Sequence, residues 1–146
     1  GELPRLIALG RAIKRDLEAR HEIVHPEESE LRDVYGVVFW QREGGERLTH
    51  RNVTVFADGE VDRSPCGSGT SARLALLAAE DDIAPGEALR HLSIVGSEFT
   101  GRVVAETTVA GRAAVITEVE GSAYRTGSAE FTLDPDDPLG TGFLLR

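Results

Sequence analysis

The residues best suited to chemistry lie in one short loop, which reads DRSPCGSGT at positions 62–70. Cys66 is the only cysteine of the chain, so the thiol cannot form an internal disulfide and must be inert, reactive or intermolecular. Gly67 and Gly69 allow backbone angles that other residues resist, and a helical pattern follows directly. We therefore expect Cys66 to lie at the positive end of a helix, where a thiolate is stabilised.

The same loop predicts a binding site for an amino acid. Backbone amides around Gly67 and Ser68, at the start of the expected helix, can hold a carboxylate without a basic side chain. Asp62, four residues before Cys66, offers a carboxylate to an amino or imino nitrogen. A thiolate between these two groups is suited to remove the α-proton of the bound amino acid as a general base.

Two other interpretations of Cys66 stay open at this point. Free cysteine is among the most buried residue types, which makes an inert core thiol the simplest alternative. The charged and glycine-rich neighbours of Cys66 count against it. A cysteine hydrolase would instead need His50 or His91 to orient the thiol, and neither lies in a recognisable signature.

Composition limits the partners that the chain can have. Sixteen basic and 25 acidic residues give a net charge of −9, which repels nucleic acid and anionic membranes. His21 and His25 have helical pair spacing without a third ligand, and Gly67 and Gly69 lack the lysine of a phosphate-binding loop. We therefore predict a soluble, cytoplasmic protein with no metal, nucleotide or nucleic-acid partner.

Hydrophobic periodicity predicts the elements around the loop. A helix is expected from Leu3 to Ala19 and a connection from His21 to Asp33. Residues 71–80 are apolar on nearly every side, which predicts a central helix enclosed by other elements. Strands are expected over residues 34–40, 52–57, 91–95, 102–109, 112–119 and 130–133, with a short apolar strand in residues 140–145. A hairpin turn is expected at Ala110-Gly111. The pattern indicates one α+β domain over residues 1–146, with an antiparallel barrel-like sheet around a central apolar helix.

The loop and its surroundings resemble the second cysteine motif of the proline racemase family, which includes hydroxyproline 2-epimerases and trans-3-hydroxyproline dehydratases. The resemblance begins with DRSPCGSGTSAR at residues 62–73. It extends to RNVTVF at 51–56, SIVGS at 93–97, FTG at 99–101, DPL at 137–139 and GF at 142–143. Ser68 stands where many relatives have threonine, which keeps the hydroxyl.

This resemblance implies the C-terminal lobe of a two-lobe enzyme with a diaminopimelate-epimerase-like fold. It implies catalysis without a cofactor, in which two thiols on opposite faces of proline or hydroxyproline alternate as acid and base. By position, Cys66 is one catalytic thiol, Gly67 and Ser68 bind substrate, and Asp62 contacts the ring nitrogen. Phe56 is expected to line the ring pocket and to favour an unsubstituted ring.

Only half of this machinery is expected in the chain. The other thiol of the family belongs to the N-terminal lobe, and the chain has no second cysteine. The chain begins at Gly1 and lacks methionine, so we expect a processed or partial chain that is inactive by itself. Its expected partners are the N-terminal lobe and, through exposed apolar surface, a second copy as a homodimer. An isolated lobe that only binds its partner is the non-catalytic alternative.

The sequence favours racemisation or epimerisation over dehydration. In the dehydratase branch the position of Cys66 is typically threonine, because elimination needs a base on one face only. Residues 67–69 and 142–145 nevertheless resemble dehydratase sequences, so trans-3-hydroxy-L-proline dehydration remains the alternative activity.

Overall fold

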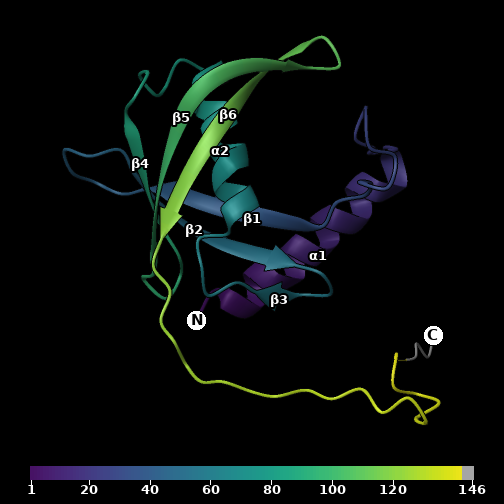
Figure 1. Ribbon diagram of the computed structural model, residues 1–146. Coiled ribbons are helices and arrows are strands. Elements are labelled where there is room, and N and C mark those ends of the chain that lie inside the picture. The colour runs from purple at the N-terminus through teal and green to yellow at the C-terminus, as the bar shows by residue number, and fades with distance from the viewer. Residues whose placement is uncertain (143–146) are drawn as a thin grey trace.

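The computed structural model describes residues 1–142, which form two helices and a six-stranded sheet (Figure 1). In chain order the elements are α1 (Leu3–Arg20), β1 (Gly36–Arg42), β2 (Thr49–Phe56), β3 (Glu60–Val61), α2 (Gly67–Ala79), β4 (Ala88–Leu92), β5 (Glu98–Val109) and β6 (Arg112–Gly121). The strand order is β1-β2-β4-β5-β6, and β3 pairs with β2. No helix within the described part of the chain has the length and apolar composition of a membrane span.

The sheet is mixed, whereas the sequence analysis predicted antiparallel strands throughout. β2 and β4 pair in parallel, with His50 opposite His91, and the other pairs are antiparallel. The reason is the connection, because the chain leaves β2, passes through α2 and returns along the sheet in the same direction. The turn predicted at Ala110-Gly111 is confirmed, with φ of 47° and 74° between β5 and β6.

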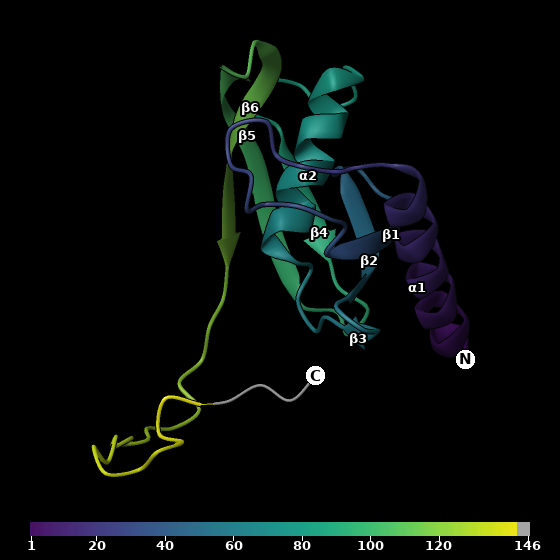
Figure 2. The ribbon, with the colours of Figure 1, turned by 90° about the vertical axis from the view of Figure 1, so that its right-hand side faces the viewer.

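The two helices lie on opposite faces of the sheet (Figure 2). The predicted first helix is confirmed, and α1 packs on β1 and β2, where its buried Gly10 lets Val55 approach. A Cβ atom at Gly10 would lie 3.0 Å from the Cβ of Val55. Side chains alternate along a strand, so Asn52, Thr54 and Phe56 of β2 point to the opposite face, toward α2.

α2 is less enclosed than its composition predicted. Its buried residues, Thr70, Arg73, Leu74 and Leu77, face the sheet, but Leu76 is 53% exposed. The sheet curves around one side of α2 and does not close, because β1 and β6 stand at opposite ends of the strand order and do not pair within residues 1–142. The predicted barrel-like closure is therefore not observed.

Several predicted boundaries were wrong, and β2, β4 and β5 each begin three or four residues before their predicted starts. α2 begins at Gly67 instead of residue 71, so the glycine-rich loop is its first turn. β1 begins at Gly36 instead of residue 34, and Trp40 in this strand is 47% exposed. The strand predicted at 130–133 is absent, because this segment pairs with no strand and Phe131 is 92% exposed. The strand expected in 140–145 lies partly outside the described residues, and residues 140–142 are not in a strand.

The core lies between α2 and the strands beside it. It is formed by Leu48, Leu74, Leu77, Ile83 and Leu89, with Ala78 and Val103 packed against it. Gly101 of β5 allows close approach to α2, because a Cβ atom there would lie 2.8 Å from the Cδ1 atom of Leu74. Leu74 is thus, with Leu77, a side chain through which α2 is held against the sheet.

We expect Leu74→Ala to lower the free energy of unfolding by about 2–5 kcal/mol, because it leaves a cavity beneath α2. Leu76→Ala, on the exposed side of the same helix, is the matched control and should change it by less than about 1 kcal/mol. Urea denaturation followed by circular dichroism measures both. Equal losses in the two variants would show that α2 is not anchored through Leu74.

Candidate functional site

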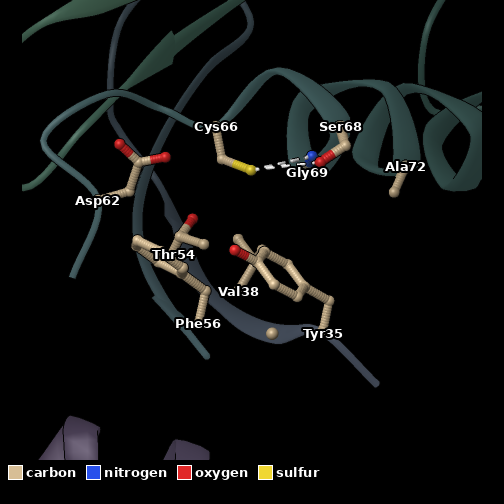
Figure 3. A pocket seen from close by; sticks show the side chains of 10 residues that line it. Tyr35, Val38, Thr54, Phe56, Asp62, Cys66, Ser68, Gly69 and Ala72 are labelled. Atoms are coloured by element: carbon tan, nitrogen blue, oxygen red, sulfur yellow. Dashed lines mark hydrogen bonds between the residues drawn. The ribbon is translucent and has the colours of Figure 1, made fainter. Parts of the chain in front are cut away.

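A cavity of about 470 Å³ lies between β1, β2 and the start of α2 (Figure 3). Its lining residues are Tyr35, Gly36, Val38, Thr54, Phe56, Asp62, Cys66, Ser68, Gly69 and Ala72. The polar side chains come from the residue before β1, from β2, from the loop that follows β3 and from the first turn of α2. The cavity therefore brings one thiol, one carboxylate and several hydroxyl groups together against an apolar wall.

The loop before α2 is held by local hydrogen bonds. The Ser64 amide donates to Oδ1 of Asp62 at 2.8 Å, and the Cys66 amide donates to Oγ of Ser64 at 3.0 Å. From the turn after β4, Oγ of Ser97 donates to the carbonyl of Arg63 at 2.6 Å. Asp62 and Cys66 are thus fixed relative to one another by the fold of the loop itself.

Cys66 caps the N-terminus of α2 in a rare backbone conformation. Its φ of 64° and ψ of 119° are unusual for a residue other than glycine, and such strain concentrates at functional sites. The Gly69 amide donates to Sγ at 3.4 Å, and Oγ of Ser68 lies 3.5 Å from the same sulfur. The thiol is half-buried, and these two contacts orient it at the positive end of the helix.

The first amides of α2 are available to an anion. The Thr70 amide donates to the Cys66 carbonyl, whereas the amides of Gly67 and Ser68 have no partner among the described residues. Gly69 must stay small, because a Cβ atom there would lie 3.1 Å from Cγ2 of Val38 and 3.3 Å from Sγ of Cys66. Two free amides and the thiol thus share one helix end.

A buried hydrogen-bond network supports the strained loop from below. Nδ2 of Asn52 donates to the Pro65 carbonyl at 2.7 Å and lies 2.8 Å from Nε2 of His91. Oγ1 of Thr70 lies 2.9 Å from Nδ1 of His91 and donates to the Cys66 carbonyl at 2.7 Å. Because the Pro65 carbonyl only accepts, the amide nitrogen of Asn52 faces it, and Nε2 of His91 must then accept too. His91 is therefore neutral, with its proton on Nδ1 pointing to Thr70.

Electrostatics agree with this tautomer. Burial, with smaller contributions from His50 and Arg73, lowers the pKa of His91 to about 4. Burial and the nearby Arg73 and Arg42 guanidinium groups lower the pKa of His50 to about 4. Nε of Arg73 donates to Nδ1 of His50 at 3.3 Å, and its guanidinium lies 3.7 Å from the ring centroid of Trp40. Arg73 thus takes a neutral histidine and an aromatic face as partners.

The structure brings most of the predicted site residues together. Asp62, Cys66, Ser68 and Phe56 line the cavity, and Gly67 contributes its amide beside it without lining the wall. The cysteine hydrolase alternative receives no support, because within residues 1–142 both buried histidines form hydrogen bonds with groups other than the thiol.

Several residues of the site were missed by the sequence analysis. Tyr35, Val38 and Thr54 line the cavity. Strand alternation could have identified Val38 and Thr54, whereas Tyr35 precedes β1. The network of Asn52, Thr70 and His91 gave no local signal, because it joins β2, α2 and β4, which are far apart in sequence.

Known proteins are similar to this chain over almost its whole length. A family model described as "Proline racemase" matches residues 1–144. A trans-3-hydroxy-L-proline dehydratase of Bacillus thuringiensis subsp. konkukian (strain 97-27) is 47% identical over 136 residues, which are 93% of this chain and 41% of the relative. A 3-hydroxyproline 2-epimerase of Burkholderia multivorans (strain ATCC 17616 / 249) is 47% identical over 142 residues, which are 97% of this chain and 42% of the relative.

Solved structures give the same result. A hydroxyproline epimerase from Agrobacterium vitis, crystallised with bound trans-4-hydroxy-L-proline, matches with a TM-score of 0.83 and 40% identity. The match covers 97% of this chain and 40% of that chain. The chain thus spans about two fifths of the length of the relatives it matches.

We predict that the protein loses stability as the pH falls from about 6.5 to 4. The folded state keeps His91 neutral with a pKa of about 4, whereas in the unfolded chain it takes up a proton near pH 6.5. The unfolded state therefore binds more protons in this window, and between neutral pH and about pH 5 His91 alone should cost about 2 kcal/mol. Urea denaturation at neutral pH and at about pH 5 measures this loss of unfolding free energy.

His91→Gln removes this titration, so its free energy of unfolding should depend less on pH than that of the unsubstituted protein. His21→Gln, an exposed histidine, is the control and should leave the pH dependence unchanged. An unchanged pH dependence in His91→Gln would mean that His91 is not held neutral by the fold.

Proposed function

This chain belongs to the proline racemase family, and we propose that it forms one wall of an active site that exchanges the α-proton of proline or a hydroxyproline. The observation that carries the proposal is the helix end itself. Cys66, the free amides of Gly67 and Ser68, and Asp62 meet at one cavity. Among the residues that line this cavity, Tyr35 is the one further ionisable side chain. These groups complement the three parts of a cyclic α-imino acid that surround the reacting carbon.

The substrate carboxylate is proposed to bind the free amides of Gly67 and Ser68. Both lie in the first turn of α2, where the helix dipole favours an anion. The imino nitrogen, positively charged at neutral pH, is proposed to face the carboxylate of Asp62, of which Oδ1 is already oriented by the Ser64 amide. These two anchors leave the α-carbon facing the sulfur of Cys66.

The proposed reaction is a proton exchange with no net change of atoms. The Cys66 thiolate takes the α-proton from one face, and the electron pair of the broken C–H bond stays on the α-carbon, stabilised by the neighbouring carboxylate and charged nitrogen. A second acid then delivers a proton to the opposite face. The chain has no second cysteine, so this acid is proposed to come from another lobe of a larger protein. In the reverse direction Cys66 delivers the proton as a thiol.

Dehydration of trans-3-hydroxy-L-proline is a second candidate, because a 47% identical relative bears that name. Cys66 would then remove the α-proton, and the resulting thiol would return this proton to the ring hydroxyl as the C–O bond breaks. Water leaves, and the enamine that remains tautomerises to a ketimine. One base on one face is sufficient for this reaction. The product distinguishes the two candidates, because an epimerase returns a hydroxylated ring and a dehydratase does not.

We expect Cys66→Ser, in a full-length protein that contains this lobe, to lose racemisation or epimerisation by at least about 100-fold, because serine is a far weaker acid than cysteine and proton transfer contributes this much. Exchange of the α-hydrogen with deuterated solvent, followed by NMR for each enantiomer, measures the effect. Ala75→Ser, at an exposed position of the same helix, is the control and should exchange normally. If Cys66→Ser still exchanged both enantiomers at the original rate, Cys66 would not be the base.

The 146-residue chain alone should show no racemisation, because it offers a thiol to only one face of the ring. Polarimetry with each enantiomer of proline and of 4-hydroxyproline measures this. Addition of the remaining part of the protein should restore turnover. Turnover by the pure chain would contradict the proposal that a second lobe supplies the other acid.

A further inference from the structure

We propose that Thr54 is a specificity-determining residue, whose hydroxyl forms a hydrogen bond with the ring hydroxyl of a hydroxylated cyclic imino acid. The inference rests on the proposed function, because it takes the substrate ring to lie between Asp62 and Cys66. It adds to that function a group that distinguishes hydroxyproline from proline.

Thr54 carries a buried polar atom without a partner. The residue is 5% exposed, less than 1 Å² of its Oγ1 atom is accessible, and the oxygen has no hydrogen-bond partner among the described residues. Oδ1 of Asn52 is the other such atom in the described part of the chain, but the Asn52 side chain does not line the cavity. A buried hydroxyl without a partner destabilises the protein, so its presence in a cavity wall indicates a partner that arrives with the ligand.

Thr54 lies where a bound ring would pass. It occupies β2 on the face that points to α2, two residues before Phe56, and both side chains line the cavity with Asp62 and Cys66. Figure 3 shows the hydroxyl oxygen of Thr54 directed toward the space bounded by the Asp62 carboxylate and the Cys66 sulfur. A substrate that fills this space therefore covers the hydroxyl.

The other groups of the cavity leave one role unfilled. Asp62 suits the imino nitrogen, the amides of Gly67 and Ser68 suit the carboxylate, and Cys66 suits the α-carbon. The ring carbons remain, and a hydroxyl on one of them is the polar group that can pair with Thr54. The hydroxyl of Tyr35, also in the lining, belongs to a side chain that is 71% exposed, so water reaches it.

This inference opposes the preference expected from Phe56. An aromatic wall alone favours an unsubstituted ring. The unpaired hydroxyl of Thr54 beside it favours a substrate whose ring carries a hydroxyl. A site with an unpaired hydroxyl strongly rejects a substrate that lacks a hydroxyl. An apolar wall rejects a substrate with an added hydroxyl only weakly. We therefore expect hydroxyproline to be preferred over proline.

Thr54→Val tests the inference, because valine keeps the shape and removes the hydroxyl. In a full-length protein that contains this lobe, kcat/KM for α-hydrogen exchange is measured with proline, trans-3-hydroxyproline and trans-4-hydroxyproline. The ratio of hydroxyproline to proline should fall about tenfold, the loss of one neutral hydrogen bond. The isomer that loses more identifies the ring carbon. Thr108→Val, at an exposed position of β5, is the matched control and should leave the ratio unchanged.

Two results of the exchange assay would overturn the inference. One is a ratio that Thr54→Val leaves unchanged. The other is a loss of hydroxyproline preference in Tyr35→Phe but not in Thr54→Val.

The melting temperature gives an independent readout. Thr54→Val should melt no lower than the unsubstituted protein, whereas Thr70→Val, which removes a hydroxyl with partners, should melt lower. If the melting temperature falls as much in Thr54→Val as in Thr70→Val, the Thr54 hydroxyl already has a hydrogen-bond partner in the protein, and the inference is overturned.

Failure of the proposed function gives a different pattern. In that case the unsubstituted protein exchanges the α-hydrogen of none of the three compounds. Ligand-induced stabilisation then decides the inference without turnover. Thr54→Val should lose the increase in melting temperature that hydroxyproline produces, and retention of the full increase would overturn the role of Thr54.

Discussion

The site depends on one constraint, which is that Cys66 is held at positive φ where the chain turns into α2. The side chain of a residue other than glycine resists this conformation, so the surrounding structure must stabilise it. Asn52 and Thr70 do so by donating to the carbonyls of Pro65 and Cys66, the two peptide groups next to the strained residue. His91 joins these two donors and is itself held neutral by burial and by the geometry of its partners. The network thus lies beneath the thiol and contacts it only through the backbone.

The turn at Cys66 explains why one loop can hold several functional groups. It places the sulfur within reach of the Gly69 amide and leaves the amides of Gly67 and Ser68 free at the same helix end. A longer side chain at Gly69 would press on the sulfur and on Val38, so small residues are required where the helix meets β1. The energetic cost of the strained turn is offset by packing of α2 through Leu74 and Leu77 in the core. The proposed chemistry therefore depends on the stability of the helix as much as on the thiol.

Sequence reasoning succeeded where the signal is local. The helix from Leu3, the turn at Ala110-Gly111 and the nearness of Asp62 to Cys66 follow from periodicity, turn residues and short spacing. The enclosure of α2 was overestimated, because apolar residues on every side of a helix do not say which elements cover them, and Leu76 is exposed. A strand at 130–133 was predicted from alternation alone, but a strand also requires a neighbour. His91 and Thr54 were missed because their importance comes from contacts between distant segments.

A crystal structure of a full-length protein containing this lobe, with bound hydroxyproline, tests the central claim most directly. The claim is that one helix end supplies both the base and the carboxylate site. The substrate carboxylate should lie about 2.7–3.2 Å from the amides of Gly67 and Ser68. The α-carbon should lie about 3–3.5 Å from Sγ of Cys66. A carboxylate bound elsewhere, with the sulfur directed away from the α-carbon, would contradict the account.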